Sequence, residues 1–236
     1  MKKKFVFSPK KPEDFISEKG KRYMFNFENM NGLYYFHNLN EFKEAVSSKS
    51  SLNFIDSAIL FFWAKLKNKK DIARNRGADF TRRFLSNSSS KDKHFFIGLE
   101  KKELPKILEE FPNLSFENLK AHNPSFVKGY LFDKKEVDKI AKAINKSKPD
   151  YVWVCVGSPK QSILSAQLFN KTTAKYFSNI GGAIDFITEK KKEAPKLFQK
   201  IGLEWLYRLI TDFRHSGKKV NRSFIAIKHL GSVEIK

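Results

Sequence analysis

One aspartate stands where general-base chemistry would need it. Asp56 directly follows an apolar run at 52–55 whose residue types are typical of a strand. A carboxylate held at a strand end with a raised pKa can take a proton from an attacking hydroxyl. The same side chain would also suit the N-cap of a helix that we expect at 58–66, and the sequence leaves both roles open.

A cluster of charges surrounds one glycine shortly afterwards. Arg74 and Arg76 precede Gly77, and Asp79 follows it. The planar guanidinium group of arginine binds two oxygens of a diphosphate at once, so this spacing is suited to an anion site. The same residues would also form a solvated turn, which the sequence equally allows.

A glycine-containing loop follows the apolar run at 151–156. Gly157 lets a ligand approach the backbone, and the helix that follows offers free N–H groups to an anion. Lys160 adds a positive charge, and Gln161 can both donate to and accept from a uracil or sugar edge. The loop lacks the glycine spacing of a P-loop or a dinucleotide fingerprint, and an ordinary strand-to-helix turn would also fit.

A second loop of this kind follows the run at 176–180. Gly181 and Gly182 permit unusual backbone dihedrals and close contact with a ligand. Asp185 then has three possible roles: a base, an anchor for a sugar hydroxyl, or a helix cap, which is the commonest fate of such an aspartate.

Short apolar runs alternate with amphipathic stretches along the sequence, a pattern that is typical of an α/β fold. The elements of such a fold must position these residues. We expect strands at 33–36, 52–55, 94–97, 151–156 and 176–180. We expect helices at 41–46, 58–66, 79–85, 104–111 and 134–147, another ending at 169, and one that starts near 195 and runs to about 213. Such units predict a Rossmann-like, mostly parallel sheet flanked by helices, whose ligands bind beyond the carboxyl ends of the strands.

The chain divides into three parts by composition. Residues 1–32 are rich in Lys, Phe and Asn without a steady period, so an edge hairpin and a loose basic arm are both open. Residues 33–188 are the expected α/β catalytic core. Residues 189–236 form a basic, helical C-terminal appendage in which aromatic and cationic side chains interleave. That mixture suits an anionic membrane interface, or equally a packed helix with a basic outer face.

The charge balance favours anionic partners. Lys and Arg number 46 against 25 Asp and Glu, a formal net charge of +21. This charge suits nucleic acid, anionic lipid or phosphorylated small molecules, or simply a lysine-rich solvated surface. A single cysteine excludes a disulfide scaffold, and no Cys/His spacing or Asp-x-Asp pair indicates a metal site. The apolar run at 58–64 is too short to span a bilayer and no secretory signal is evident, so we expect a cytoplasmic protein.

Five motifs in the second half carry a resemblance to one family. They are Pro149-Asp150, Gly157-Ser-Pro-Lys-Gln161, Gly181-Gly-Ala-Ile-Asp185-Phe, Ala194-Pro195 and Gly202-Leu-Glu-Trp-Leu-Tyr-Arg208-Leu. In order and spacing the stretch 149–214 resembles the WecG/TagA/CpsF glycosyltransferases, glycosyltransferase family 26. Weaker matches at Asn38, Asp56 and Arg74-x-x-Gly77-x-Asp79 extend the resemblance to about 34–225.

The resemblance implies an inverting, metal-independent transfer that needs no cofactor. The donor would be a UDP-sugar carrying a hexose or an N-acetylhexosamine of the N-acetylmannosamine type. The acceptor would be a polyprenyl-diphosphate-linked saccharide in bacterial surface polysaccharide biosynthesis. It also implies a peripheral position at the inner face of the cell membrane, with the C-terminal appendage closing the site and contacting the anionic bilayer. A homo-oligomer stays open.

The resemblance also implies roles for individual residues. Asp56 would be the catalytic base, Arg74 would face the donor diphosphate, and Asn38 and Gln161 would contact donor or acceptor. The arginines of the tail would bind the lipid diphosphate. The implied substrate-binding set is Asn38, Arg74, Gly77, Asp79, Gly157, Lys160, Gln161, Gly181, Gly182, Asp185, Arg208 and Arg214.

Several positions depart from the family pattern. Asp56 stands between Ile55 and Ser57 where the family has Pro-Asp-Gly, and Phe36 stands where it has threonine. Ser162 replaces a glutamate, and the glycine pair expected after 94–97 is reduced to Gly98. These changes imply an altered sugar, acceptor or activity rather than an altered fold.

Two other classes of function stay open beside the transferase. A non-catalytic protein that binds a UDP-sugar or lipid diphosphate would follow if Asp56 is misplaced. A basic nucleic-acid-binding protein would fit the charge and the many aromatics, but the sequence carries no DNA- or RNA-binding signature, so we expect no nucleic-acid partner.

Overall fold

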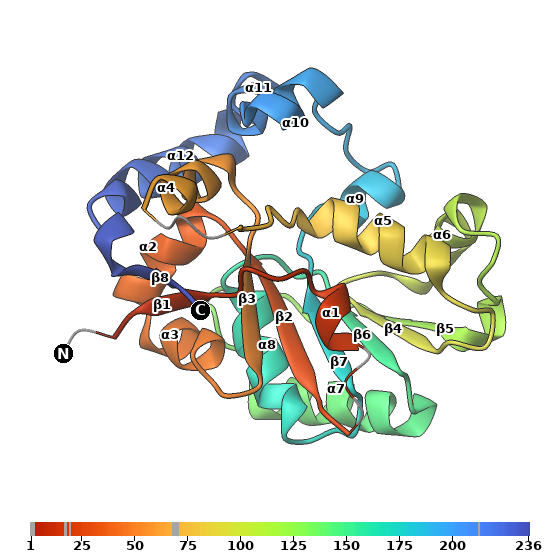
Figure 1. Cartoon of the computed structure of the whole chain (residues 1–236). Coiled ribbons are helices and arrows are strands. Elements are labelled where there is room, and N and C mark those ends of the chain that lie inside the picture. Colours follow the sequence, from red (N-terminus) through yellow and green to blue (C-terminus); the bar gives the residue numbers. More distant parts are fainter. Residues whose placement is uncertain (1–2, 17, 19, 68–70, 212) are drawn as a thin grey trace.

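The computed structural model describes residues 3–16, 18, 20–67, 71–211 and 213–236, and its centre is a parallel sheet (Figure 1). The strands of this sheet are β2 (Tyr23–Glu28), β3 (Ser51–Ile55), β4 (His94–Ile97), β5 (Leu119–His122), β6 (Tyr151–Val154) and β7 (Tyr176–Asn179). Their order is β3-β2-β7-β6-β4-β5, and every pairing is parallel. The α/β fold with a mostly parallel sheet is confirmed.

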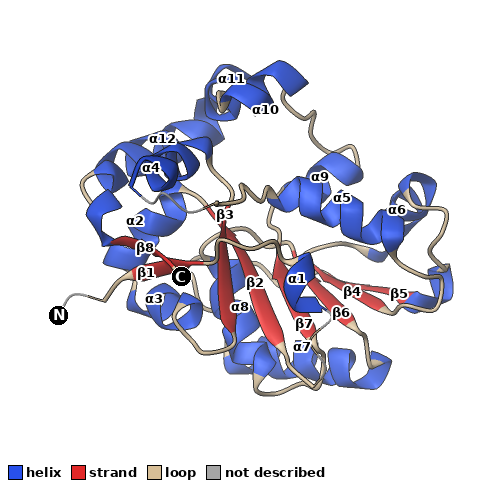
Figure 2. Cartoon of the chain, viewed as in Figure 1, coloured by secondary structure: helices blue, strands red, loops and turns tan. Residues whose placement is uncertain are grey.

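Helices cover both faces of the sheet (Figure 2). They are α1 (Glu13–Ile16), α2 (Met30–Asn38), α3 (Asn40–Val46), α4 (Ala58–Lys67), α5 (Gly77–Asn87), α6 (Leu104–Glu110), α7 (Lys134–Ser147), α8 (Lys160–Phe169), α9 (Ala183–Ile187), α10 (Lys196–Ile201), α11 (Glu204–Thr211) and α12 (Phe213–Ile227). Short 3₁₀ turns lie at Lys101–Glu103, Phe116–Asn118 and Leu230–Ser232.

Side-chain alternation along the strands divides the core between the two faces. On one face Phe25, Phe54 and Trp153 pack with residues of α5, α6 and α9. On the other face Val152 and Phe177 pack with residues of α7 and α8. Because both faces are buried, β6 (YVWV) is apolar throughout, as parallel strands usually are, whereas β2, β3 and β7 also carry buried polar side chains.

A polar row interrupts the α8 face. The Asn26 amide donates to Asn53 Oδ1 at 3.0 Å, and the Asn179 amide donates to Asn26 Oδ1 at 2.7 Å. Ser165 of α8 donates to Asn179 Oδ1. All four side chains are buried, so each bond offsets a desolvation cost that an unpaired amide would impose. The row fixes how β3, β2, β7 and α8 lie relative to one another.

A separate apolar cluster joins distant parts of the chain. Strand β1 (Phe5–Phe7) pairs in parallel with β8 (Val233–Ile235). Phe5 stacks on Phe36 of α2 with ring centroids 4.5 Å apart, and side chains of α4 and α12 complete the cluster. This cluster holds α4 and α12 beside the end of β3 from which the candidate site is built.

Two expectations for the N-terminal third are wrong. Residues 33–36 belong to helix α2, because Asn29 caps the helix by accepting from the Asn31 N–H at 2.9 Å and its apolar side chains pack inward. The strand lies upstream as β2, which pairs with β3 and β7 and is therefore central. Both structures expected for residues 1–32, an edge hairpin and a loose basic arm, are therefore wrong for the residues of β2. The boundaries of the other two expected units stay predictions.

Two further differences concern single elements. Strand β5 was not expected, because its four residues include Lys120 and His122 and carry little apolar pattern. The helix expected from 195 to 213 is instead divided into α10 and α11 at Gly202, whose φ of 79° ends the first segment. A Cβ there would also lie 2.2 Å from the Ala58 Cβ, so glycine lets this turn pack on α4.

Candidate functional site

Asp56 lies at the carboxyl end of β3, as the sequence predicts. Its N–H donates to the Glu28 carbonyl at 2.9 Å, and its Oδ1 accepts from the Gly77 N–H at 3.2 Å. It does not cap α4, because the Leu60 N–H bonds instead to the hydroxyl of Ser57 at 3.2 Å. The capping alternative is therefore wrong, and the carboxylate faces the start of α5.

The surroundings of Asp56 favour a base that works near neutral pH. Burial raises the pKa of Asp56 to about 6, and the negative charge of Glu204 adds to the rise. The Gly77 N–H and the charges of Arg74 and Arg76 act in the opposite direction. A carboxylate with such a pKa is ionised at pH 7 and still basic enough to share a proton in a transition state.

The two arginines of the predicted anion site are bound by the C-terminal helices. Arg74 donates to the Asp56 carbonyl at 2.9 Å and to the Glu204 carboxylate at 3.1 Å. Arg76 forms ion pairs with Glu204 at 3.1 Å and with Glu193 at 2.8 Å. The alternative of a solvated turn is wrong, because both arginines hold acidic side chains from the tail.

Asp79 and Gly77 complete this end of the site. Asp79 forms an ion pair with Arg76 at 2.8 Å, while the backbone of Gly77 supplies the N–H that Asp56 accepts. We call the group of Arg74, Arg76, Glu193 and Glu204 the clasp, because it ties α11 and the segment before α10 to the end of β3 and the start of α5. Gln199 adds a bond of 2.6 Å to Arg76.

Gln161 and the glycines meet at the carboxyl ends of β6 and β7. The Gln161 amide donates to the Asn179 carbonyl at 2.9 Å, while its buried Oε1 has no hydrogen-bond partner among the described residues. A Cβ on Gly181 would approach that Oε1 to 3.0 Å. Gly157 has a φ of 81° and faces open space. This end of the site therefore has an unused acceptor beside open backbone.

Two charged residues near these loops are engaged with neighbouring segments. Lys160 donates to the Val127 carbonyl at 2.7 Å, and Asp185 forms an ion pair with Lys191 at 3.0 Å. Asp185 lies inside α9 and is not its cap, since Gly182 occupies that position. The remaining roles of Asp185, as a base or a hydroxyl anchor, stay predictions.

Asn38 lies apart from the other predicted site residues. Its exposed side chain donates to the Tyr34 carbonyl at the far end of α2, about 12 Å along the helix from the end of β2. The asparagine that follows a strand end is Asn29. Arg208 and Arg214 belong to α11 and α12, and their side chains lie outside the described residues.

Sequence reasoning missed Glu28, Glu193, Gln199 and Glu204. Glu204 lies inside the Gly-Leu-Glu-Trp-Leu-Tyr-Arg motif, in which only Arg208 was expected to bind substrate. Glu28 had a detectable signal, because Phe25 and Phe27 alternate with Asn26 and Glu28 as in a strand.

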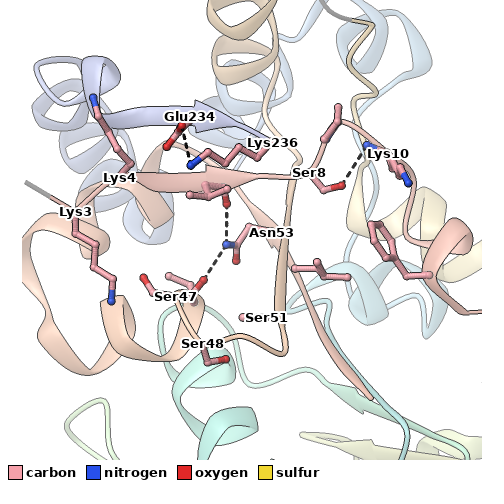
Figure 3. A pocket seen from close by; sticks show the side chains of 15 residues that line it. Lys3, Lys4, Ser8, Lys10, Ser47, Ser48, Ser51, Asn53, Glu234 and Lys236 are labelled. Atoms are coloured by element: carbon pink, nitrogen blue, oxygen red, sulfur yellow. Dashed lines mark hydrogen bonds and ion pairs between the residues drawn. The ribbon is translucent and has the colours of Figure 1, made fainter. Parts of the chain in front are cut away.

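A wide hollow of about 1400 Å³ lies elsewhere, beside edge strand β3 and the β1–β8 pair (Figure 3). Its cationic lining is Lys3, Lys4, Lys10 and Lys236. Figure 3 shows Lys236 paired with Glu234, at 3.0 Å, and the Asn53 amide directed at backbone carbonyls. None of the predicted site residues lines this hollow.

Within the part of the chain that the structure describes, no helix is long and apolar enough to cross a bilayer. In the same residues no three or more His, Cys, Asp and Glu side chains gather in a way that could hold a metal ion.

The family follows from a comparison with known proteins. The model of the Glycosyl transferase WecG/TagA/CpsF family matches residues 10–229. The chain belongs to this family. The match begins upstream of β2 and includes the clasp and both glycine loops, so both ends of the candidate site lie within the matched residues.

Curated relatives in the WecG/TagA/CpsF family include two proteins of Staphylococcus aureus, from strains MRSA252 and NCTC 8325 / PS 47. Both are named N-acetylglucosaminyldiphosphoundecaprenol N-acetyl-beta-D-mannosaminyltransferase, and they are 31% and 30% identical to this chain over 112 residues. The matched stretch covers 48% of this chain and 40% of each relative, so the chain spans well under half the length of the relatives it matches.

Proposed function

We propose that this chain is an inverting glycosyltransferase that moves a sugar from a UDP-sugar to a polyprenyl-diphosphate-linked saccharide. The observation that carries the proposal is that Asp56 and the glycine loops at Gly157 and Gly181 follow the carboxyl ends of strands in the same parallel sheet. Membership of the WecG/TagA/CpsF family and the names of the staphylococcal relatives support it. An N-acetylmannosamine-type donor and a diphosphate-linked N-acetylglucosamine acceptor follow by analogy with those names.

The proposed reaction is a single displacement. A hydroxyl of the acceptor sugar attacks the anomeric carbon as its proton passes to Asp56 Oδ. The new C–O bond forms on one side of that carbon while the bond to the diphosphate breaks on the other, and UDP leaves with the electron pair. The backbone N–H groups of Lys160 and Ser162 in the first turn of α8 bind anionic oxygens of the donor, while that of Gln161 donates to the Gly157 carbonyl. Gln161 Oε1 accepts from the uracil or sugar.

Arg74 would bind the diphosphate only after releasing a side chain that it already holds. Its guanidinium is held by Glu204, so a diphosphate must compete with that carboxylate for the same N–H groups. Arg208 and Arg214 would meet the lipid diphosphate from the same C-terminal helices.

We propose peripheral membrane contact through α4 as well as the basic tail. Ile59, Phe62 and Leu66 lie on one face of α4 with exposed fractions of 42%, 57% and 83%. Lys65 and Lys67 lie in its last turn. An exposed apolar face flanked by lysines matches an anionic bilayer interface. Because α4 begins two residues after Asp56, this contact would bring a membrane-bound acceptor to the base.

Cosedimentation with anionic vesicles tests the contact. Replacing Phe62 and Leu66 together by glutamate removes apolar contact and adds repulsion, so we expect the bound fraction to fall about tenfold. Phe116→Glu is the matched control, because Phe116 is 56% exposed but lies on a 3₁₀ turn before β5. Equal binding of the double variant and the control would contradict the α4 assignment.

A UDP-release assay tests the transfer itself. A panel of UDP-sugars is combined with a short-chain polyprenyl-diphosphate-linked amino sugar, and UDP is measured with and without the acceptor. Acceptor-dependent release with one donor is the expected result. Tight UDP binding without release across a broad acceptor panel would indicate a binding protein instead.

A further inference from the structure

Glu28, the last residue of β2, is a carboxylate that the proposed reaction does not use. It is 1% exposed. The Ser162 hydroxyl of α8 donates to its Oε1 at 3.4 Å, a long and weak bond. No ion pair from Glu28 to a described lysine, arginine or histidine is present. A buried carboxylate without a cation is costly to ionise.

Helix α2 closes directly over this carboxylate. A Cβ on Gly32 would lie 2.0 Å from Glu28 Oε2, so only a glycine leaves room for the carboxyl group at that position. The helix backbone therefore covers one oxygen while Ser162 contacts the other. The carboxyl group therefore lies in a slot between α2 and α8.

The slot lies between the two ends of the candidate site. The Glu28 carbonyl accepts from the Asp56 N–H, and β2 lies between β3 and β7 in the sheet (Figure 1). Ser162 directly follows Gln161, the residue with the unused acceptor. Glu28 is thus a neighbour of both the proposed base and the proposed donor loop.

The charges facing the two carboxylates differ. Burial raises the pKa of Glu28 to about 8, the charge of Asp56 adds to the rise, and only Ser162 opposes it. Asp56 faces the negative Glu204, but also the Gly77 N–H and the cations Arg74 and Arg76. Asp56 therefore gives up its proton first, and around pH 7 the pair holds one charge.

We propose that Glu28 is a positioning residue: as a neutral carboxylic acid it leaves Asp56 the single anion of the pair, and its ionisation in alkaline solution stops transfer. This inference rests on the proposed glycosyltransferase function. A second negative charge beside Asp56 repels the donor diphosphate and leaves a buried, unpaired anion at the strand end.

The test is the pH dependence of kcat/KM for UDP release from pH 5 to 10. The wild-type profile rises near pH 6 and falls near pH 8. At pH 9.5 about 3% of a group with a pKa of 8 stays protonated, so the fall approaches thirtyfold. Glu28→Gln keeps a neutral side chain of the same shape and abolishes the fall. An unchanged alkaline fall in this variant overturns the proposal.

Two more variants control for structural effects. Ser162→Ala removes the hydroxyl that favours the ionised form of Glu28, so the fall moves to higher pH. A fall that stays in place in Ser162→Ala overturns the proposal even if Glu28→Gln does not fold. Glu136→Gln is the matched control, because Glu136 is also a buried glutamate but pairs with His122, and it keeps the wild-type fall.

A readout without turnover separates this inference from the proposed function. Carboxyl ¹³C NMR of the whole chain follows every glutamate through the same pH range. The expected result is one resonance that titrates near pH 8 and is missing from Glu28→Gln. Its absence from the wild-type spectrum overturns the inference. Its presence with no transfer from any donor would overturn only the glycosyltransferase proposal.

Discussion

The two ends of the candidate site differ in what occupies them. At the end of β3, Arg74 and Arg76 are saturated by acidic side chains of the tail. At the ends of β6 and β7, Gly157 faces open space and Gln161 Oε1 has no partner within the described residues. The chain supplies its own counter-charges at one end and leaves polar groups for a ligand at the other.

This difference between the two ends would impose an order on the binding of donor and acceptor. At the open end, Gln161 Oε1 has no described hydrogen-bond partner that a donor must displace. A diphosphate that approaches Arg74 must exchange places with Glu204, which belongs to the helices that we expect to contact the membrane. The filled end is therefore sensitive to the position of the tail, whereas the open end is not.

The largest expected effect comes from Asp56→Asn. An amide cannot accept the proton of the attacking hydroxyl, so kcat/KM should fall by about 10³-fold while UDP binding is retained. UDP release and UDP binding measured side by side check this. Ser57→Ala is the neighbouring control, because it removes the α4 cap without touching the proton path. Activity of Asp56→Asn within tenfold of wild type would exclude the role of base.

Gln161→Ala tests the open end and should have an intermediate effect. Removing the unused acceptor deletes one hydrogen bond to the donor, so the UDP dissociation constant should rise about tenfold, which calorimetry measures. Gln167→Ala on the same helix is the control, since Gln167 lies beyond the first turn of α8. Equal affinities for the two variants would mean that Gln161 has no contact with the nucleotide.

The smallest effect is expected at the filled end, from Glu204→Gln. The charge of Glu204 raises the pKa of Asp56, so removing it lowers that pKa. Asp56 is then ionised at lower pH, and the acid limb of the kcat/KM profile, near pH 6 in the wild type, should move downward by a fraction of a pH unit. Glu193→Gln should leave the limb in place, because Glu193 pairs with Arg76 without being among the groups that shift Asp56. An upward movement would contradict the assignment.

Much of the sheet could be predicted from the sequence because buried parallel strands are continuous apolar runs bounded by Gly, Pro or Asp. The run at 151–156 predicts β6, which ends two residues earlier at Val154, and Gly157 and Gly181 lie in the loops after β6 and β7 as expected. The segment 33–36 was misread because Tyr and Phe favour strands, whereas tertiary packing and the Asn29 cap made it helical.

Local sequence patterns could not predict contacts between segments that lie far apart in the chain. Nothing within 74–79 indicates that its arginines bind Glu193 and Glu204, more than a hundred residues away. Likewise, only the folded chain shows the carboxylate of Glu28 against the hydroxyl of Ser162.

The pairing of β1 with β8 has a consequence for how the protein is made. Strand β1 leaves the ribosome long before its partner, which follows more than two hundred residues later in the chain. At 5–20 residues per second the wait is roughly 10 to 45 s. During that time Phe5 and Phe7 lack the strand against which they are buried. The cluster that seats α4 and α12 is therefore completed only once β8 has emerged, so the α4 surface that we propose for membrane contact is seated long after α4 itself has been made.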